Sequence, residues 1–239
     1  SLRGKFKPEL DYAGKVAQSC MHCHQIRDAE RLVFRSVKQP LPDEAVFPYP
    51  LPDVIGMKLD PRERAKVLSV EQNSPAATAG VRAGDRILRL GGQPIISVAD
   101  IQWVLHHTPN DSTLEAELGR PDSARTVTIA LPGRWRRTSD IAWRTSTWDL
   151  RRMGTGGLLL EDVSDADRRK AGLDSSDLAL RVKHVGEYGE HAVAKRAGFR
   201  KGDIIVSFDG RAESMNESAL LAHALQNKKP GDQIAVTVV

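Results

Sequence analysis

The sequence contains an internal repeat, and this repeat limits the fold more than any other feature. The pattern Ala-Gly-x-x-x-Gly-Asp-x-Ile begins at Ala79 and recurs at Ala197, with every repeated position offset by the same 118 residues. In each copy the first glycine is expected to end a short helix in the left-handed region, where glycine has no steric penalty. The Gly-Asp pair is typical of a tight turn that starts a strand. The repeat therefore predicts two domains of one topology.

The same order of elements surrounds each copy: a strand, a short helix, a strand after the Gly-Asp turn, a longer helix and a closing strand. In the first copy we expect these elements at residues 65–70, 74–79, 86–90, 97–108 and 113–118, with one more strand at 125–131. In the second copy we expect them at 178–182, 191–197, 204–208, 216–227 and 233–239. The second copy shows no counterpart of the strand at 125–131, so we expect that its final strand is missing from this chain.

The residues around the first Gly-Asp turn resemble a known domain family. Residues 74–87 have the sequence S-P-A-A-T-A-G-V-R-A-G-D-R-I, which resembles the bacterial PDZ domains found after the high-temperature-requirement serine proteases. The second copy is similar, and residues 168–173 resemble the small extra helix that many such domains carry. The resemblance implies an α/β (α+β) fold with two PDZ-like, partly open β-barrels, each with two helices.

The repeat and the resemblance together predict the domain organisation. We expect PDZ domains at residues 55–131 and 156–239, joined by a linker at 132–155. Residues 1–54 precede them with a helix at 10–37, and a proline-rich extended strap follows that helix.

The resemblance also implies grooves that bind peptides by strand addition, with a loop of the pattern x-Φ-G-Φ holding the terminal carboxylate on backbone N–H groups. The first copy fits this pattern with Val54, Ile55, Gly56 and Met57, continued by Lys58 and Leu59. The second copy fits less well, because glycine occupies an apolar position in the run Thr155, Gly156, Gly157, Leu158 and Leu159. We therefore expect weaker carboxylate binding in the second groove.

The longer helix of each copy is expected to form the opposite wall of the groove. Residues four apart share one helical face, which selects Ile101 and Leu105 in the first copy and Leu221 and Leu225 in the second. The same spacing fits core residues equally well. Segments of the chain itself could also occupy either groove.

The two cysteines lie in the sequence C-M-H-C-H, the attachment pattern of c-type haem. In such sites the two thiols form thioethers and the adjacent histidine binds the iron, which makes Cys20, Cys23 and His24 candidate ligands of covalent haem c. Two alternatives stay open. The cysteines and His24 could form a metal or dithiol redox site with a remote histidine, or both thiols could be small buried hydrophobes.

The order of this motif, the proline-rich strap and two PDZ domains also resembles the C-terminal part of bacterial proteins that begin with a thioredoxin-like domain. That resemblance implies a redox domain in the full-length protein. A serine protease site is not expected, because the sequence lacks G-N-S-G-G and 54 residues before the first PDZ copy cannot hold the catalytic barrels.

The predicted linker, residues 132–155, contains three of the four tryptophans and six arginines against two aspartates. Arginines interleaved with aromatic residues can bind single-stranded nucleic acid. The alternation of Ile141, Trp143, Thr145 and Thr147 instead favours a strand with one buried face, docked between the two domains. Since the net charge of the chain is only +4, we favour the structural interpretation and expect no nucleic-acid partner.

These observations favour a non-catalytic tandem PDZ module of a bacterial cell-envelope protein, periplasmic or extracytoplasmic, that binds protein or peptide C-termini or exposed strands. No stretch approaches the roughly 20 apolar residues of a membrane-spanning helix, so membrane insertion is not expected. The rival from another class is a haem or dithiol electron-transfer protein that uses the PDZ pair as a docking scaffold. A third hypothesis is a scaffold for interaction or oligomerisation with both grooves filled.

Overall fold

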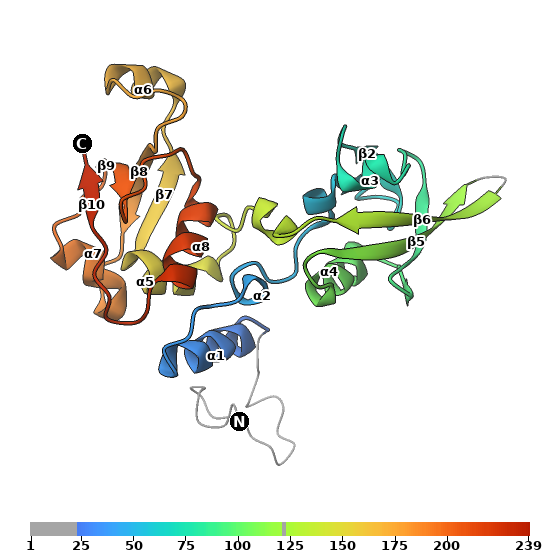
Figure 1. Ribbon diagram of the computed structural model, residues 1–239, viewed down its shortest axis with the longest axis horizontal. Helices are drawn as coiled ribbons and strands as arrows, with labels where there is room; N and C mark the ends of the chain where they lie inside the picture. The colour runs from blue at the N-terminus through green and yellow to red at the C-terminus, as the bar shows by residue number, and fades with distance from the viewer. Residues whose placement is uncertain (1–22, 121–122) are drawn as a thin grey trace, which may run out of the picture. The chain divides into compact units, whose positions relative to one another are not determined.

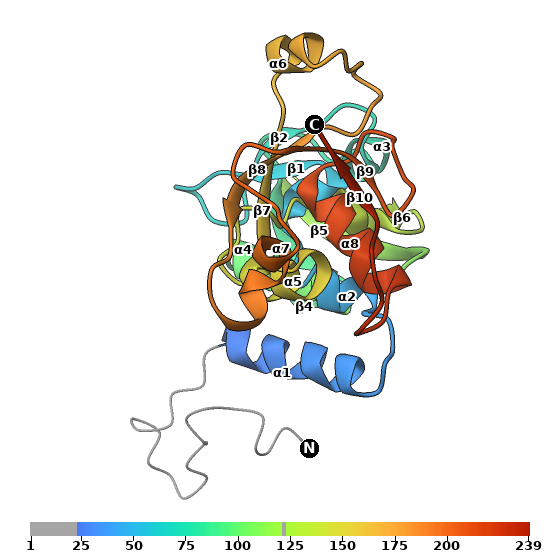
Figure 2. The same cartoon turned by 90° about the vertical axis from the view of Figure 1, so that its left-hand side faces the viewer.

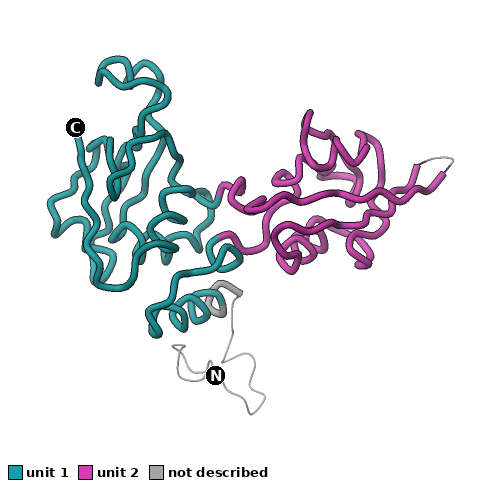
Figure 3. The backbone as a smooth tube through the Cα atoms, in the orientation of Figure 1, with its two compact units in different colours: residues 1–46, 141–239 teal, residues 47–140 magenta. Residues whose placement is uncertain are grey.

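The two copies of the repeat lie in two different units of the backbone (Figure 3). The computed structural model describes residues 23–120 and 123–239. The first-copy unit contains residues 47–140, and the second-copy unit contains residues 141–239 together with the chain up to residue 46. Both units combine helices with antiparallel sheets, which confirms the predicted α/β (α+β) class (Figure 1).

The first-copy unit follows the predicted order of elements, and the strand predicted at 86–90 coincides with β3. Its sheets are β1-β2 and β4-β3-β5-β6, with antiparallel pairing throughout. Its elements are η1 (Pro52–Ile55), β1 (Met57–Leu59), β2 (Val67–Val70), α3 (Pro75–Thr78), β3 (Arg86–Leu90), β4 (Gln93–Pro94), α4 (Val98–His107), β5 (Ser112–Arg120), β6 (Ser123–Leu131) and η2 (Trp135–Thr138).

Local sequence signals fix where the helices of this unit begin. Ser74 is the N-cap of α3, because its hydroxyl accepts a hydrogen bond from the Ala77 N–H at 3.1 Å, and Pro75 fills the first helical position. A capping box starts α4, where the Asp100 carboxylate accepts a hydrogen bond from the Ser97 N–H at 2.8 Å. These caps place α4 at the start of the groove described below.

Alternate residues of the sheet face the core of the first-copy unit. Leu114, Ala116 and Leu118 of β5 are buried, while the residues between them are more exposed. Ile101 and Leu105 of α4 pack into the same core and are fully buried. Each such side chain stabilises the unit by about 1.5–3 kcal/mol relative to an exposed one, so the core stabilises the walls of the groove.

The second-copy unit repeats this order with a four-stranded sheet, β10-β9-β8-β7. In the part of the chain that the structure describes, β10 lies at the edge of the sheet and no counterpart of β6 follows it. The elements are α1 (Cys23–Ser36), α2 (Asp43–Val46), α5 (Thr147–Thr155), β7 (Leu158–Asp162), α6 (Asp165–Lys170), β8 (Leu180–Val185), η3 (Gly189–Ala192), α7 (Val193–Arg196), β9 (Ile204–Phe208), α8 (Glu217–Asn227) and β10 (Val236–Val238).

The segment predicted as a buried strand is not a strand. Residues 141–146 form turns, and α5 begins at Thr147. The alternating pattern was misleading because Ile141 and Thr147 are buried while Trp143, between them, is 66% exposed. Instead, the buried positions within α5 follow helical spacing. The helix packs against α8, and the two helices lie side by side in Figures 1 and 2.

The N-terminal helix is described from Cys23, and its end at Ser36 lies one residue before the predicted end. The buried Arg31 attaches α1 to its own unit, because its Nε donates to the Ala45 carbonyl at 3.1 Å. The proline-rich strap contains the short helices α2 and η1 rather than a continuous extended stretch. Within residues 23–120 and 123–239, no helix has the length and apolar character needed to cross a membrane.

Candidate functional site

The x-Φ-G-Φ loop of the first copy follows η1 and turns at Gly56. Gly56 has φ +79°, in the left-handed region, and its N–H donates to the Asp53 carbonyl at 2.8 Å. A β-carbon on Gly56 would lie 2.1 Å from Cβ of Ser74, so a larger residue does not fit there. The side chains of Val54 and Ile55 point into the core and are 9% and 0% exposed. The loop therefore presents backbone rather than side chains.

One edge of β1 is open to an incoming strand. On the side of β2, the Gly56 carbonyl accepts from the Glu71 N–H at 2.8 Å, and the Asp60 N–H donates at 2.9 Å to the chain that precedes β2. Since backbone groups alternate in direction along a strand, those of Met57 and Leu59 point to the opposite edge. Among the described strands, β2 is the sole sheet neighbour of β1.

A groove of about 610 Å³ runs along this open edge. Most of its lining residues are apolar, and the charged ones include both signs. The lining consists of Leu51, Pro52, Asp53, Met57, Lys58, Leu59, Asp60, Pro61, Arg64, Ala65, Leu68, Ser97 and Val98. The groove can therefore accept an extended chain with apolar side chains without selecting strongly for charge.

The helix residues predicted for the wall are buried. Ile101 and Leu105 are 0% exposed and belong to the core, so their contact with a ligand stays a prediction. Val98, at the first position of α4, lines the groove and is 40% exposed. Sequence reasoning missed Val98, although it lies three residues before Ile101 and hence on a neighbouring part of the same helical face.

The N–H groups of the second-copy loop are hydrogen-bonded to residues of α5. Gly156 ends α5 in the left-handed region, and its N–H donates to the Arg151 carbonyl. The Gly157 N–H donates to the same carbonyl at 3.0 Å, and the Leu158 N–H donates to Oγ1 of Thr155 at 3.2 Å. The N–H groups that would hold a ligand carboxylate in this loop thus have partners within the chain.

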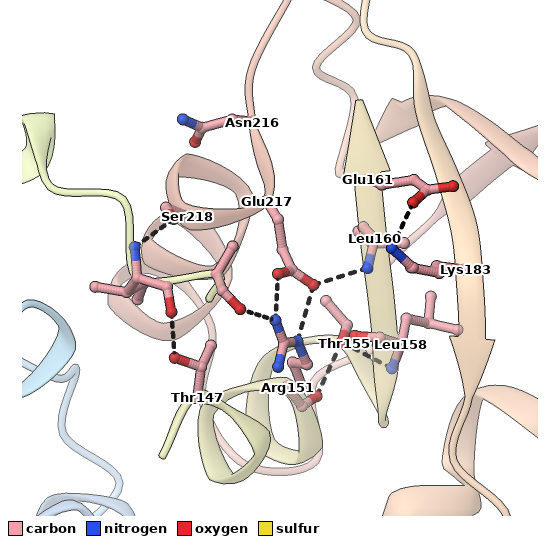
Figure 4. A network of polar contacts seen from close by, with 12 residues as sticks. Thr147, Arg151, Thr155, Leu158, Leu160, Glu161, Lys183, Asn216, Glu217 and Ser218 are labelled. Atoms are coloured by element: carbon pink, nitrogen blue, oxygen red, sulfur yellow. Dashed lines mark hydrogen bonds and ion pairs between the residues drawn. The ribbon is translucent and has the colours of Figure 1, made fainter. Parts of the chain in front are cut away.

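A buried ion pair covers the open edge of β7 (Figure 4). The Leu160 N–H, which points away from β8, donates to Oε1 of Glu217 at 2.8 Å. Arg151 binds the same carboxylate through Nε at 2.9 Å and Nη2 at 2.6 Å, and both side chains are at most 3% exposed. The predicted wall residues Leu221 and Leu225 are 0% exposed, beneath Gly154 of α5.

The Gly-Asp turn of the first copy contains a buried carboxylate, that of Asp85. Asp85 is 2% exposed, and Nε and Nη2 of Arg120 donate to it at 2.6 and 3.0 Å. Burial alone would raise the pKa of Asp85, but hydrogen bonds from Arg120 and from the Arg82 N–H outweigh burial and hold the pKa below its ordinary value. The charge stabilises the turn and lies outside the groove lining.

The C-x-x-C-H prediction falls largely outside the described residues. Cys20 precedes them, and Cys23 and His24 are described only as backbone at the start of α1. Within the described part of the chain, no cluster of three or more histidine, cysteine, aspartate or glutamate side chains could hold a metal ion. Haem at Cys20, Cys23 and His24 therefore stays a prediction.

Each unit contains an antiparallel sheet, and in the first unit a glycine loop leads into a strand with an open edge. These features define a class of domains that bind peptides in a groove. The family model "PDZ domain" matches residues 53–131 and 171–239, which together are more than half of the sequence. The chain belongs to the PDZ domain family, which confirms the resemblance noted from the repeat. The second match begins after the loop and β7, where the second copy departs most from the pattern.

The curated relatives are bacterial proteases that carry PDZ domains. Periplasmic serine endoprotease DegP of Salmonella typhimurium is 29% identical over 150 residues, which cover 63% of this chain and 27% of that protein. A probable periplasmic serine endoprotease DegP-like of Pseudomonas savastanoi is 29% identical over 157 residues, covering 64% of this chain and 31% of that protein. The chain spans less than a third of either relative, and it contains no protease domain.

Solved structures show similarity over about one copy. A serine endoprotease from Yersinia pestis shares 27% identity over 33% of this chain and 28% of that chain, with a TM-score of 0.29. The HtrA3 PDZ domain bound to a phage-derived ligand, FGRWV, shares 24% identity over 32% of this chain and 81% of that chain, with a TM-score of 0.28. These comparisons give no support to a thioredoxin-like domain or to the C-x-x-C-H motif.

Proposed function

We propose that the chain is a non-catalytic protein-binding module whose first groove binds exposed C-termini or extended strands by strand addition. The observation that carries this proposal is the open edge of β1 beside a mainly apolar groove of about 610 Å³. PDZ domains in general bind peptides in this way, which supports the assignment.

The residues of the first groove have distinct roles in this proposal. The backbone groups of Met57 and Leu59 pair with the incoming chain. Gly56 lets the loop backbone approach the terminal carboxylate, while Leu68 and Val98 contact the ligand side chains. Burying one apolar terminal side chain contributes about 1.5–3 kcal/mol, which corresponds to a factor of about ten or more in affinity.

The setting proposed for this module is the bacterial cell envelope. The relatives are named as periplasmic proteins, and this supports an extracytoplasmic location for the present chain. A module without a protease domain would act by holding a partner rather than by cleaving it. Its partners are then proteins that expose a C-terminus or an unpaired strand.

The test is to select binders from a random C-terminal peptide library on the intact chain and to titrate them with free and amidated ends. We expect amidation to weaken binding at least tenfold, because the carboxylate loses its loop contacts. Val98→Arg should weaken binding similarly, since Val98 lines the groove. The matched control is Val193→Arg, which replaces a valine of similar exposure, 47% against 40%, in the second-copy unit.

Two results would contradict the proposal. Peptides that bind equally well after amidation would show that the loop does not hold a carboxylate. Equal losses in the Val98 and Val193 variants would show that binding does not occur in the first groove.

A further inference from the structure

We propose that α5 is a built-in ligand of the second PDZ groove and that the second-copy unit accepts no peptide while α5 stays in place. The inference rests on the peptide-binding function proposed for PDZ grooves in this chain. It assigns that function to the first groove alone and makes the second a latent site.

Packing between α5 and α8 is close. Gly154 lies where a β-carbon would come within 3.3 Å of the Leu221 side chain, 3.4 Å of Leu225 and 3.5 Å of Ala224. Leu150 and Thr147, one and two turns earlier on the same face of α5, are 1% exposed. The helix face that would otherwise line a groove is therefore covered by a segment of the same unit.

Arg151 and Glu217 act as a latch between three elements. Arg151 comes from α5, Glu217 from the first turn of α8, and the carboxylate of Glu217 also accepts the Leu160 N–H of β7 (Figure 4). The two side chains make a bidentate pair, the strongest geometry for arginine and carboxylate. Nη2 of Arg151 additionally donates to the Ala142 carbonyl at 2.7 Å.

The latch makes closure of the groove depend on α5. Without Arg151, Glu217 would be a buried carboxylate without its cationic partner, a costly arrangement that is relieved when water reaches the site. A Glu217 side chain that turns toward this water would release the Leu160 N–H, which would then be available to an incoming strand. Displacement of α5 should therefore expose both the loop and the strand edge.

The first copy lacks this device. Val98, which follows the N-cap Ser97, is the first residue of α4 and has the helix position that Glu217 has in α8, and valine has no side-chain acceptor. The loop of the first copy follows the four-residue η1, whereas that of the second follows the nine-residue α5. The same fold thus carries one open groove and one that its own helix closes.

The experiment uses a reversible staple in a chain whose latch is broken. The variant combines Arg151→Met with Gly154→Cys and Ala224→Cys, since the 3.5 Å spacing of these β-carbons suits a disulfide. Cys20→Ser and Cys23→Ser prevent mispairing, and Val98→Arg blocks the first groove. Oxidation should keep α5 on α8, and reduction should release it. The oxidised form is therefore a control for correct folding, measured on the same sample.

We expect a random C-terminal peptide library to yield binders to the reduced form and none to the oxidised form. In the reduced form the Leu160 amide should exchange with solvent at least 100-fold faster, while the Val182 amide of β8 should be unchanged. Binders to both forms, continued protection of Leu160 after reduction, or exposure of Leu160 without any binder would each overturn the proposal. If the intact chain bound no peptide, the function proposed for the first groove would be wrong. Closure of the second groove is tested separately, because the exchange of the Leu160 amide is measured without a ligand.

Discussion

Gly56 and Ser74 are in contact at the start of the first groove, where a β-carbon on Gly56 would lie 2.1 Å from the β-carbon of Ser74. Ser74 cannot easily move, because it is the N-cap of α3. The carboxylate loop and the first turn of α3 therefore constrain each other. The groove geometry depends on this contact as much as on the loop sequence.

Gly56→Ala should destabilise the first-copy unit more than Gly92→Ala. Both glycines have φ +79°, so both substitutions carry the strain of a left-handed alanine, about 1–2 kcal/mol. Gly92 has open space around its β-carbon position, whereas Gly56 faces Ser74. Displacing the N-cap should add about 1 kcal/mol at Gly56. Hydrogen exchange of the β5 and β6 amides measures the stability of this unit alone.

The same contact predicts a rescue. Ser74→Gly removes the atoms that a residue at position 56 would meet, so the double variant Gly56→Ala, Ser74→Gly should recover the part of the loss that comes from the clash. If the effects of the two substitutions were simply additive, the proposed contact would not explain the role of Gly56.

The first-copy unit should lose stability in acid through Asp85. The folded-state pKa of Asp85 lies below its ordinary value of 3.8, so the pair with Arg120 contributes fully above that value and is lost as the pH falls through the lower folded pKa. Asp85→Asn should cost about 1.5–3 kcal/mol at neutral pH and flatten this acid dependence. The control is Asp203→Asn, which changes the corresponding turn of the second copy. Equal acid profiles for the wild type and Asp85→Asn would contradict the role of this pair.

Arg136 should stabilise the end of α4. Its buried side chain donates to the carbonyl oxygens of Leu105 at 3.2 Å and His106 at 3.0 Å, and also to that of Thr108. Arg136→Lys should cost about 1–3 kcal/mol, because an ammonium group cannot serve the same set of acceptors. The exposed Arg137 supplies the matched control, Arg137→Lys, for which little change is expected. The difference in stability is measured by denaturation monitored through hydrogen exchange of the β5 amides.

The haem prediction can be tested directly on the intact chain. Expression together with a c-type cytochrome maturation system should give a band that stains for haem on a denaturing gel, and Cys20→Ser, Cys23→Ser should abolish it. The same chain made in an ordinary cytoplasm should be colourless, because thioether formation needs that system. Absence of stain after maturation would exclude covalent haem at Cys20 and Cys23.

The repeat made most of the fold predictable, because the glycines at 80 and 198 and in the Gly-Asp turns have positive φ angles that few other residues adopt. The loop around Gly56 could also be predicted from the sequence, since its apolar neighbours fit one known pattern. The role of α5 could not be predicted from the sequence. Ile141 and Thr147 fit the alternating pattern of a strand, although α5 is a helix. Its fixed position depends on Arg151 meeting Glu217 from a distant part of the chain, and local periodicity carries no such information.

Comparing the two copies position by position would have given one signal. Glu217 stands at the start of a helix where the first copy has Val98, and a carboxylate at a predicted groove wall needs a cationic or N–H partner when it is buried. The identity of that partner required the structure. The same holds for Val98, whose exposure on the groove could not be separated from core packing by spacing alone.

Hydrogen exchange of the intact chain, with and without a saturating selected peptide, tests the central claim most directly. Strand addition in the first groove should slow exchange of the Met57 and Leu59 amides at least tenfold, because they gain backbone partners. The Leu158 and Leu160 amides, which already have partners at 3.2 and 2.8 Å, should show no change. Slower exchange at Leu158 and Leu160, or none at Met57 and Leu59, would contradict a chain with one open and one closed groove.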